Sequence, residues 1–538
     1  MKKLSVLGLV LLVLAIVVGC AGMSRRGQDP QTEIVIIGAG GAGFAAGLEA
    51  VQAGRRVIII EKNQFTGGNT ATAGSAMNAA NPELIKSLNL QITQGEIDFI
   101  ERLSDPARVP PRNAIMARWQ DTVRAEWAAH RVANPGLLFD SPSWHSLTTY
   151  YGGDFVAKPE LVDILGQRAL ETNRWLESLG GGWLTDRLPA AVGATWRRSH
   201  TPDFSWGGSG ANFFMPVEAA FERAGGQVLT GYRADTIIME NGRAVGVSGV
   251  TYSGTPFSIR ASRAVMLATG GFGANYEMLE RHNRHWAGFT GVATSNLPSA
   301  TGDGHVMGAR AGANLIDMEW IQMVSGMGSI MEGSAITNLV LVNSNGERFI
   351  AEDERRDRIS GAVISQPGAF AWGIQDGHSI DLLLNDSVVF GGAHGRSIRE
   401  MATTNMNSAN PTMFIADTIQ ELAALIGVPY ATLQAQINAF NAAATGAASD
   451  PMGRQVFQYP INRPPFLANW ARAVIHHTMG GVEINENAEV LSVAGAVIPG
   501  LYAAGEVVGG VHGSNRLGAN AVPEILIFGR IAGRSMAR

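Results

Sequence analysis

The chain has 538 residues, of which 46% are hydrophobic and 16% are charged, and its formal net charge is -5. This length allows two or three domains, and the composition is that of a globular protein with a large core, which excludes global disorder. The sequence has no basic stripe interleaved with aromatic residues, so nucleic acid is not an expected partner. Cys20 is the single cysteine, which excludes disulfides within the chain, a covalently attached haem and a cysteine-bound iron–sulfur cluster.

The first 19 residues have the layout of an export signal. Two lysines precede an apolar run from Leu4 to Val18, which is short for a membrane-spanning helix. The sequence VVGC resembles a bacterial lipoprotein signal, which implies cleavage before Cys20 and attachment of lipid to its sulfur. An uncleaved N-terminal anchor is the alternative. In both cases we expect an extracytoplasmic protein held at the membrane, with residues 20–31 as a polar tether.

The first predicted structural unit binds a dinucleotide. A buried-strand pattern, EIVII, runs directly into GAGGAG, then into a helical stretch and a second strand, RRVIIIEK. Gly38, Gly40 and Gly43 have the spacing at which a tight turn, a close approach of pyrophosphate and helix packing require that no side chain be present. Glu61 ends the second strand, where a carboxylate can accept hydrogen bonds from an adenosine ribose.

Later glycine-rich segments favour FAD over NAD. The small residues of GGNTATAGSA would allow the backbone to pack closely on a flavin and its phosphates. The segments AVMLATGGF and GLYAAGEVVGG each have the pattern of a strand that ends in glycines. Each segment taken separately is also consistent with a tight turn in an α/β sheet. Together they extend the predicted cofactor site to Gly68, Asn69, Thr70, Gly74, Gly270 and Glu506.

The C-terminal region carries the most specific motifs: HHTMGG, then IPGLYAAGEVVGGVHGSNRLGANAV and FGRIAGRSMA. With these motifs the chain, from about Glu33 to Arg538, resembles the soluble fumarate reductase and flavocytochrome c flavoproteins, together with urocanate reductase and, more distantly, the 3-oxosteroid dehydrogenases. WLESLGG, RRSHTP and TGDG are weaker matches, and TGDG adds Asp303 to the predicted cofactor residues. The resemblance implies FAD as cofactor, and the lack of a haem-attachment motif leads us to expect no haem domain.

The resemblance also implies the domain organisation. The family has an α/β, Rossmann-like FAD-binding domain interrupted by an α+β clamp domain, and the substrate is held between them. Carried over to this chain, the FAD-binding domain comprises residues 32–318 and 477–538, and the clamp comprises residues 319–476. Closure of the clamp would exclude water from the site.

Four catalytic residues follow from the resemblance. The arginine and histidine that bind the substrate carboxylate fall on Arg516 and His477, and an Arg fork suits a carboxylate. By charge pattern, RFIAEDERRDR predicts a solvated face, but the resemblance places the proton-donating arginine of the family on Arg356. A guanidinium with a pKa above about 12 is a poor acid unless its proton is resupplied. Glu332, in IMEGSA, aligns with the carboxylate of that relay.

Two departures from the family pattern concern the substrate. Where the fumarate reductases have a histidine for the second carboxylate, this chain has Val324, and the relay arginine is replaced by Ala335. A second buried carboxylate would lack its donor, at a cost of about 2–5 kcal/mol. The expected substrate is therefore a mono-carboxylate enoate and not fumarate.

An additional segment, residues 100–161, is rich in tryptophan and tyrosine and is longer than in the compact fumarate reductases. Core packing is its expected use, and an aromatic wall for a larger substrate is the alternative.

Three functions are consistent with the sequence. The first is an FAD-dependent enoate reductase in anaerobic respiration, the second is a dehydrogenase of the 3-oxosteroid type, and the third is a non-catalytic lipoprotein that relays electrons through a flavin. The presence of Arg356, His477 and Arg516 favours the first, because these side chains suit a carboxylate. No haem motif or covalent FMN attachment stretch is recognisable, so we expect an external electron donor: a quinol-linked protein, a cytochrome or another flavoprotein.

Overall fold

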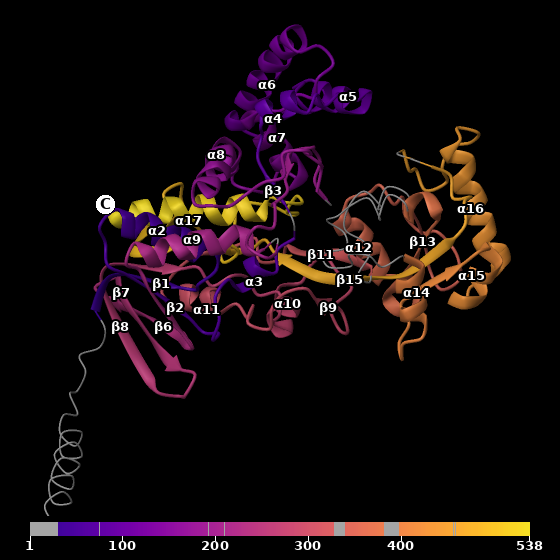
Figure 1. The fold of residues 1–538 in the computed structure, drawn as a ribbon. Coiled ribbons are helices and arrows are strands. Elements are labelled where there is room, and N and C mark those ends of the chain that lie inside the picture. The colour runs from indigo at the N-terminus through magenta and orange to yellow at the C-terminus, as the bar shows by residue number, and fades with distance from the viewer. Residues whose placement is uncertain are drawn as a thin grey trace, which may run out of the picture.

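A computed structural model describes residues 31–74, 76–191, 193–208, 210–327, 339–380, 398–455, 457 and 459–538. Figure 1 shows a large α/β lobe and a smaller lobe beside it, with strand β15 (Phe466–Thr478) running from one into the other. The predicted α/β class is confirmed. The predicted signal sequence and Cys20 lie outside the described residues.

The larger lobe is built on an eight-stranded sheet with a parallel centre. Its order is β17–β18–β8–β1–β2–β5, and β7 and β6 continue from β8. Strand β1 pairs in parallel with β2 and β8, as expected for the predicted strand–helix–strand unit. The strands are β1 (Gln31–Ile37), β2 (Val57–Glu61), β5 (Gln227–Thr230), β6 (Tyr232–Glu240), β7 (Arg243–Thr251), β8 (Pro256–Leu267), β17 (Glu489–Leu491) and β18 (Val497–Ala503).

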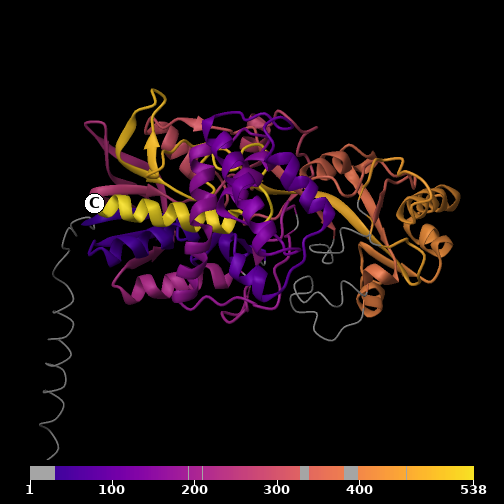
Figure 2. The same ribbon diagram turned by 90° about the horizontal axis from the view of Figure 1, so that it is seen from above.

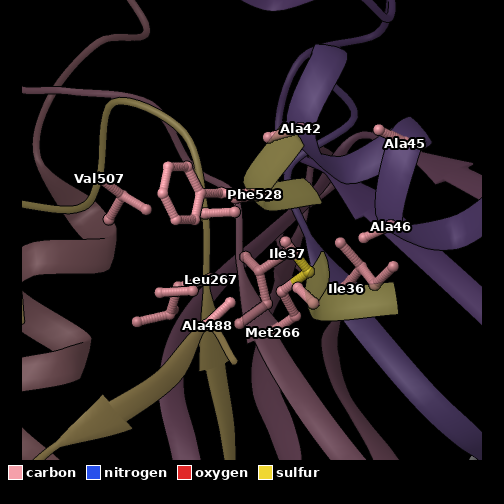
Figure 3. Packing of buried hydrophobic residues seen from close by; sticks show 14 of the residues in the cluster. Ile36, Ile37, Ala42, Ala45, Ala46, Met266, Leu267, Ala488, Val507 and Phe528 are labelled. Atoms are coloured by element: carbon pink, nitrogen blue, oxygen red, sulfur yellow. The ribbon is translucent and has the colours of Figure 1, made fainter. Parts of the chain in front are cut away.

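Helices α2 (Gly41–Gln52) and α17 (Ala521–Ala537) lie side by side on this sheet (Figures 1 and 2). Small residues allow their close contact, because a Cβ atom added to Gly533 would lie 2.3 Å from the carbonyl oxygen of Ala46. Phe528 of α17 packs with isoleucines of β1 in the buried core (Figure 3). This packing joins the C-terminal helix to the first strand–helix–strand unit, where the predicted cofactor site begins.

A group of helices stands above the sheet in Figure 1 and has a core of its own. The rings of Trp119 and Tyr150 lie 5.8 Å apart, and those of Trp144 and Trp196 lie 5.1 Å apart. These aromatic side chains are buried and pack against one another, which is the core packing expected for them. The helices are α4 (Pro82–Ser87), α5 (Gln94–Leu103), α6 (Ala114–Ala133), α7 (Pro142–Gly152) and α8 (Pro159–Ser178).

The predicted clamp region contributes to a six-stranded sheet in the order β11–β15–β13–β12, in which β14 and β9 also pair with β15. Its other strands are β9 (Ala293–Thr294), β11 (Ile321–Met327), β12 (Val340–Val342), β13 (Phe370–Gln375) and β14 (Met413–Ala416). The helical elements of this region are α12 (Arg356–Ile364), η3 (Pro367–Ala369), α14 (Ile398–Met406), α15 (Ile419–Ile426) and α16 (Tyr430–Ala444). Strand β15 crosses the limit expected between residues 476 and 477, and the domain limits stay predictions.

The remaining helices and strands lie outside the two sheets and the helical group, or pair in short two-stranded sheets. They are α3 (Gly68–Ala71), β3 (Met77–Asn78), β4 (Ser199–His200), α9 (Ala211–Arg223), α10 (Tyr276–His282), α11 (Asp303–Arg310), β10 (Leu315–Ile316) and β16 (Gly481–Val482). Among the described residues, none of the helices has the length and apolarity needed to cross a membrane. Within the same residues, no group of three or more His, Cys, Asp or Glu side chains could hold a metal ion.

Candidate active site

A groove of about 850 Å³ of empty volume opens where the central parallel strands end. The carboxyl ends of parallel strands are where α/β sheets bind ligands. Most of the predicted cofactor residues line the groove, namely Gly38, Gly40, Glu61, Gly68, Asn69, Thr70, Gly270, Asp303 and Glu506. Gly43 and Gly74 are the two predicted cofactor residues that are not part of this lining.

The turn after β1 requires glycine at two positions. Gly38 has a φ of +112°, and an added Cβ atom would lie 2.2 Å from the carbonyl oxygen of Ala268. A Cβ atom on Gly43 would lie 2.0 Å from the carbonyl oxygen of Gly38. Gly43 therefore allows α2 to pack onto the turn, and the start of α2 lines the groove through Gly41 and Ala42. Such a helix N-terminus suits a pyrophosphate.

Glu61 is held at the end of β2 by the backbone. Its carboxylate accepts hydrogen bonds from the amide nitrogens of Ala39 at 3.0 Å and Asn63 at 2.9 Å. A carboxylate has about four acceptor sites, so capacity remains for a ribose diol. Asp303, on the same groove, forms an ion pair of 2.8 Å with Lys62. The donor and acceptor groups of this groove therefore fit the adenosine and pyrophosphate parts of a dinucleotide.

Three distant segments bring together the catalytic residues predicted within the described chain. Arg356 begins α12, His477 lies near the end of β15, and Arg516 lies in the loop between β18 and α17. Nη2 of Arg356 donates to the carbonyl oxygen of Arg516 at 2.5 Å and to Oε1 of Gln322 at 2.9 Å. All three predicted residues are buried. Glu332 lies outside the described residues, and its relay role stays a prediction.

Two residues that support Arg356 were not singled out from the sequence. Nε2 of Gln322 donates to Oδ1 of Asn515 at 2.6 Å and to the carbonyl oxygen of Arg516 at 2.8 Å. Gly193, with a φ of +73°, leaves room for the arginine, because an added Cβ atom would lie 2.5 Å from Cδ of Arg356. Neither residue has a local sequence signal, since each acts through a contact made only in the folded chain.

His477 is neutral at pH 7 in this environment. Burial, followed by the charge of Arg516, holds the pKa of His477 well below its usual value. Its Nδ1 lies 3.5 Å from Oε1 of Glu506, whose carboxylate also accepts from the Thr478 amide at 3.0 Å. The positive charge available to a bound carboxylate therefore comes from the two arginines, and His477 can supply a neutral N–H donor.

The charged run at residues 348–358 is not a solvated face along its whole length. Arg348 forms ion pairs with Glu352 at 2.8 Å and Asp450 at 2.5 Å, and each of these side chains is at most 1% exposed. Arg356 is buried as well. The solvated-face prediction is wrong for these residues because Asp450, about 100 positions away, neutralises Arg348, and a charge pattern within one segment cannot reveal such a partner.

Arg355, next to Arg356, connects the start of α12 to the helical group. Arg355 donates two hydrogen bonds, of 2.7 and 3.0 Å, to the carboxylate of Asp154. Ser514, from the loop that carries Arg516, also donates to Asp154. This network fixes the start of α12 against the two segments that border the site.

Val324 is an apolar residue on β11, the strand that also carries Gln322. It lies two residues after Gln322 on β11, whose pairing with β15 is irregular between Gln322 and Met323. The Val324 side chain is half-buried, and its strand partner is Val474. Val324 stands where a histidine is expected in fumarate reductases, so this position has no hydrogen-bonding side chain here.

Glu524 supports a pH-dependent prediction. Burial, followed by the charge of Glu506, raises the pKa of Glu524 to about 8. The folded protein therefore binds a proton that the unfolded chain has released, and stability should fall as pH rises from about 4.5 to 8. We expect Glu524→Gln to raise the melting temperature of the holoprotein at pH 9 more than at pH 5, measured by thermal unfolding. An equal shift at both pH values would contradict the raised pKa.

Comparison with known proteins decides the family. The model of the FAD binding domain family matches residues 33–107 and 127–522. The chain belongs to this family of FAD-binding proteins. FAD is therefore its cofactor, as predicted, and the flavin supplies hydride chemistry when bound. The groove residues fit this group, because Glu61 can accept from its ribose and the glycines at positions 38 and 43 allow the tight turn and helix packing that form a pyrophosphate site.

The relatives of this FAD-binding protein include several reductases. It is 31% identical to a probable fumarate reductase of Shewanella frigidimarina, over 95% of this chain and 76% of the relative. It is 32% identical to the NADH:acrylate oxidoreductase of Vibrio harveyi, over 95% of this chain, but it spans only 51% of that relative's length. This FAD-binding protein is thus an FAD-dependent oxidoreductase of the group that acts on carbon–carbon double bonds.

Solved structures agree with the fold of the FAD-binding protein. The open conformation of a flavocytochrome c3 fumarate reductase has a TM-score of 0.70 and 28% identity, and the match covers 98% of this chain and 80% of that one. A 3-ketosteroid-Δ4-(5α)-dehydrogenase from Rhodococcus jostii RHA1 has a TM-score of 0.67 at 22% identity, with 96% and 98% covered. At that identity the steroid enzyme shows the shared fold and does not indicate a steroid substrate.

Proposed function

We propose that the protein reduces the carbon–carbon double bond of an α,β-unsaturated mono-carboxylate. The observation that carries this proposal is the convergence of Arg356, His477 and Arg516 in one buried site, with Val324 on the strand beside it. Two arginines and a neutral histidine can bind one carboxylate and stabilise charge that develops on it. The family relationship supports the same reaction class, since its members include fumarate, urocanate and acrylate reductases.

The roles of the side chains follow from this arrangement. Arg516 and His477 hold the substrate carboxylate and orient the double bond towards the cofactor groove. Arg356 donates a proton to the α-carbon and must then be reprotonated, for which Glu332 is the proposed source. Gln322 positions the Arg356 guanidinium through its side-chain oxygen. Burial of the site excludes water, which strengthens each of these electrostatic contacts.

The proposal is tested by re-oxidation of a reduced viologen dye by the FAD-loaded protein truncated before Met23. The acids to compare are acrylate, methacrylate, crotonate, cinnamate, urocanate and fumarate. Turnover is expected on at least one mono-carboxylate enoate, with fumarate the poorer substrate. A preference for fumarate would contradict the assignment of Val324, and silence on every acid would favour the steroid-type or electron-relay function.

Val324→His should move the preference towards fumarate. A histidine here would give the second carboxylate a donor, and a buried pairing of this kind is worth about 2–5 kcal/mol. We expect the ratio of kcat/KM for fumarate to that for a mono-carboxylate enoate to rise by at least about tenfold. Val324→Leu is the matched control, because it changes size without adding a donor. An unchanged ratio in Val324→His would argue against a substrate end at this position.

We further propose an extracytoplasmic protein anchored at the membrane through lipid on Cys20. The N-terminal pattern of two lysines, an apolar run and VVGC supports this location. An external donor, such as a quinol-linked protein, a cytochrome or another flavoprotein, would then deliver electrons to the FAD. Metabolic labelling with a fatty acid tests the anchor: wild type should carry label, and Cys20→Ser should not. A fully active, donor-coupled wild-type protein in the soluble fraction would contradict it.

A further inference from the structure

His512 is a buried histidine for which neither ring nitrogen has a hydrogen-bond partner among the described residues. Its side chain is almost fully enclosed, with the residue 4% exposed. Its ring lies 5.4 Å from the ring of His477, measured between centroids, at an interplanar angle of 73°. The residue is in the loop that leads to Arg516, four positions before it. His512 therefore borders the proposed carboxylate site without having a role in it so far.

Two other buried histidines of the described chain each have a hydrogen-bond partner for one ring nitrogen. His145 is hydrogen-bonded to Asn520 at 3.1 Å, and His305 is hydrogen-bonded to the carbonyl oxygen of Gly480 at 3.3 Å. Each of them lacks a partner for one ring nitrogen, whereas His512 lacks both. Buried polar groups in folded proteins nearly always have partners, and leaving them unpaired costs free energy. A partner for His512 is thus expected from outside the part of the chain that the structure describes.

The backbone around His512 is fixed, so the ring has a defined place. A Cβ atom on Gly153 would lie 2.2 Å from the carbonyl oxygen of His512, which shows how closely α7's C-terminal turn packs on this loop. The amide of Ser514 donates to the carbonyl oxygen of Gly153 at 3.1 Å. Gly513 has a φ of +66°, which turns the chain between the two contacts. Such support is typical of side chains held ready for a ligand.

The charges near His512 determine what it can bind. Burial, then Arg516 and Arg356, lowers the pKa of His512 to about 3. The imidazole is therefore neutral at pH 7 and has one N–H donor and one acceptor nitrogen. The arginines that face it attract an anion, and a donor beside them suits an oxygen of that anion.

We propose that His512 is a further substrate-binding residue whose ring N–H donates to an oxygen of the enoate carboxylate held by Arg516 and His477. This inference rests on the proposed function, because it requires a carboxylate in the site. It adds a second neutral donor to Arg516 and His477, so three side chains hold the carboxylate while Arg356 donates the proton to the α-carbon.

The test measures binding without turnover. The oxidised, FAD-loaded protein is titrated with a mono-carboxylate enoate, and the Kd is taken from the change in flavin absorbance. His512→Leu should weaken binding by about 10- to 100-fold, the usual effect of losing a hydrogen bond to a charged group. His512→Gln, which keeps an N–H donor, should restore binding to within a few fold of wild type. His305→Leu is the matched control for loss of a buried histidine and should leave the Kd unchanged.

FAD content and melting temperature are measured for each variant, so that a folding defect is visible. Wild-type affinity in His512→Leu, or loss of FAD in proportion to loss of enoate binding, would overturn the assignment. If His512→Leu does not fold, His512→Gln is compared with His512→Asn, whose side chain is shorter. A contact with the substrate requires the two variants to bind the enoate with different Kd values. Equal Kd values would overturn the assignment. Absence of enoate binding in wild type would reject the proposed function itself and is distinct from these outcomes.

Discussion

Replacing Arg356 by alanine is expected to lower enoate reduction by about 10²- to 10⁴-fold, the usual contribution of a positioned proton donor. The side chain is buried beside Arg516 and is held by Gln322, so its loss removes both the proton source and one positive charge. FAD content should stay at the wild-type level, because Arg356 is not part of the cofactor groove. Steady-state kinetics with a reduced viologen dye, together with the flavin absorbance of the purified protein, measure both quantities.

Two further variants test whether the loss of rate is specific to the Arg356 guanidinium. Arg358→Ala removes an exposed arginine of the same helix, which forms an ion pair of 3.5 Å with Glu354, and should leave kcat within about twofold of wild type. Arg356→Lys keeps the charge but not the planar fork, so it should recover little of the lost rate. A kcat in Arg356→Ala close to that of wild type would show that another group donates the proton.

Gly43→Val is expected to abolish FAD binding. A Cβ atom at this position would lie 2.0 Å from the carbonyl oxygen of Gly38, so the turn after β1 and the start of α2 must separate. The turn and the start of α2 form one side of the groove that receives the pyrophosphate. Overpacking at Gly43 also lowers the free energy of unfolding by about 1–3 kcal/mol or more. The purified variant should contain less than about a tenth of the wild-type FAD, measured by absorbance after denaturation.

Gly95→Ala is the control for this prediction. Gly95 lies in the first turn of α5, and an added Cβ atom would have no neighbour within 4 Å. Alanine favours a helix over glycine by up to about 1 kcal/mol, so the variant should bind FAD normally and be at least as stable as wild type. Full FAD content in Gly43→Val would mean that the helix and turn can adjust without loss of the cofactor site.

The parts of the fold that the sequence predicted are those whose signals are local. The first strand, the glycine turn, the helix and the second strand follow one another within about 30 residues, so their pattern is readable without knowledge of the rest. The pairings of β8 with β1 and with β18 each join segments more than 200 residues apart. Periodicity indicates that such strands are buried, but it does not indicate which strands are neighbours.

The residues of the candidate site also divide into those with a local sequence signal and those without one. Arg516 and His477 lie in long motifs, and Arg356 could be singled out only through the family resemblance, because its charged neighbours are typical of a surface. Gln322 and Gly193 acquire their roles through contacts with Arg356. A sequence pattern cannot show such contacts, since they depend on how β11, α12 and a distant loop meet in space.

The most direct test of the central claim is a single turnover of the purified, FAD-loaded protein. The flavin is reduced completely without oxygen, the free reductant is removed, and a mono-carboxylate enoate is mixed in while the flavin absorbance is followed. The account predicts rapid re-oxidation with one saturated acid formed per flavin, and a rate lowered by about 10²- to 10⁴-fold in Arg356→Ala. A reduced flavin that persists in the presence of every mono-carboxylate enoate but is re-oxidised by a non-substrate electron acceptor would contradict it.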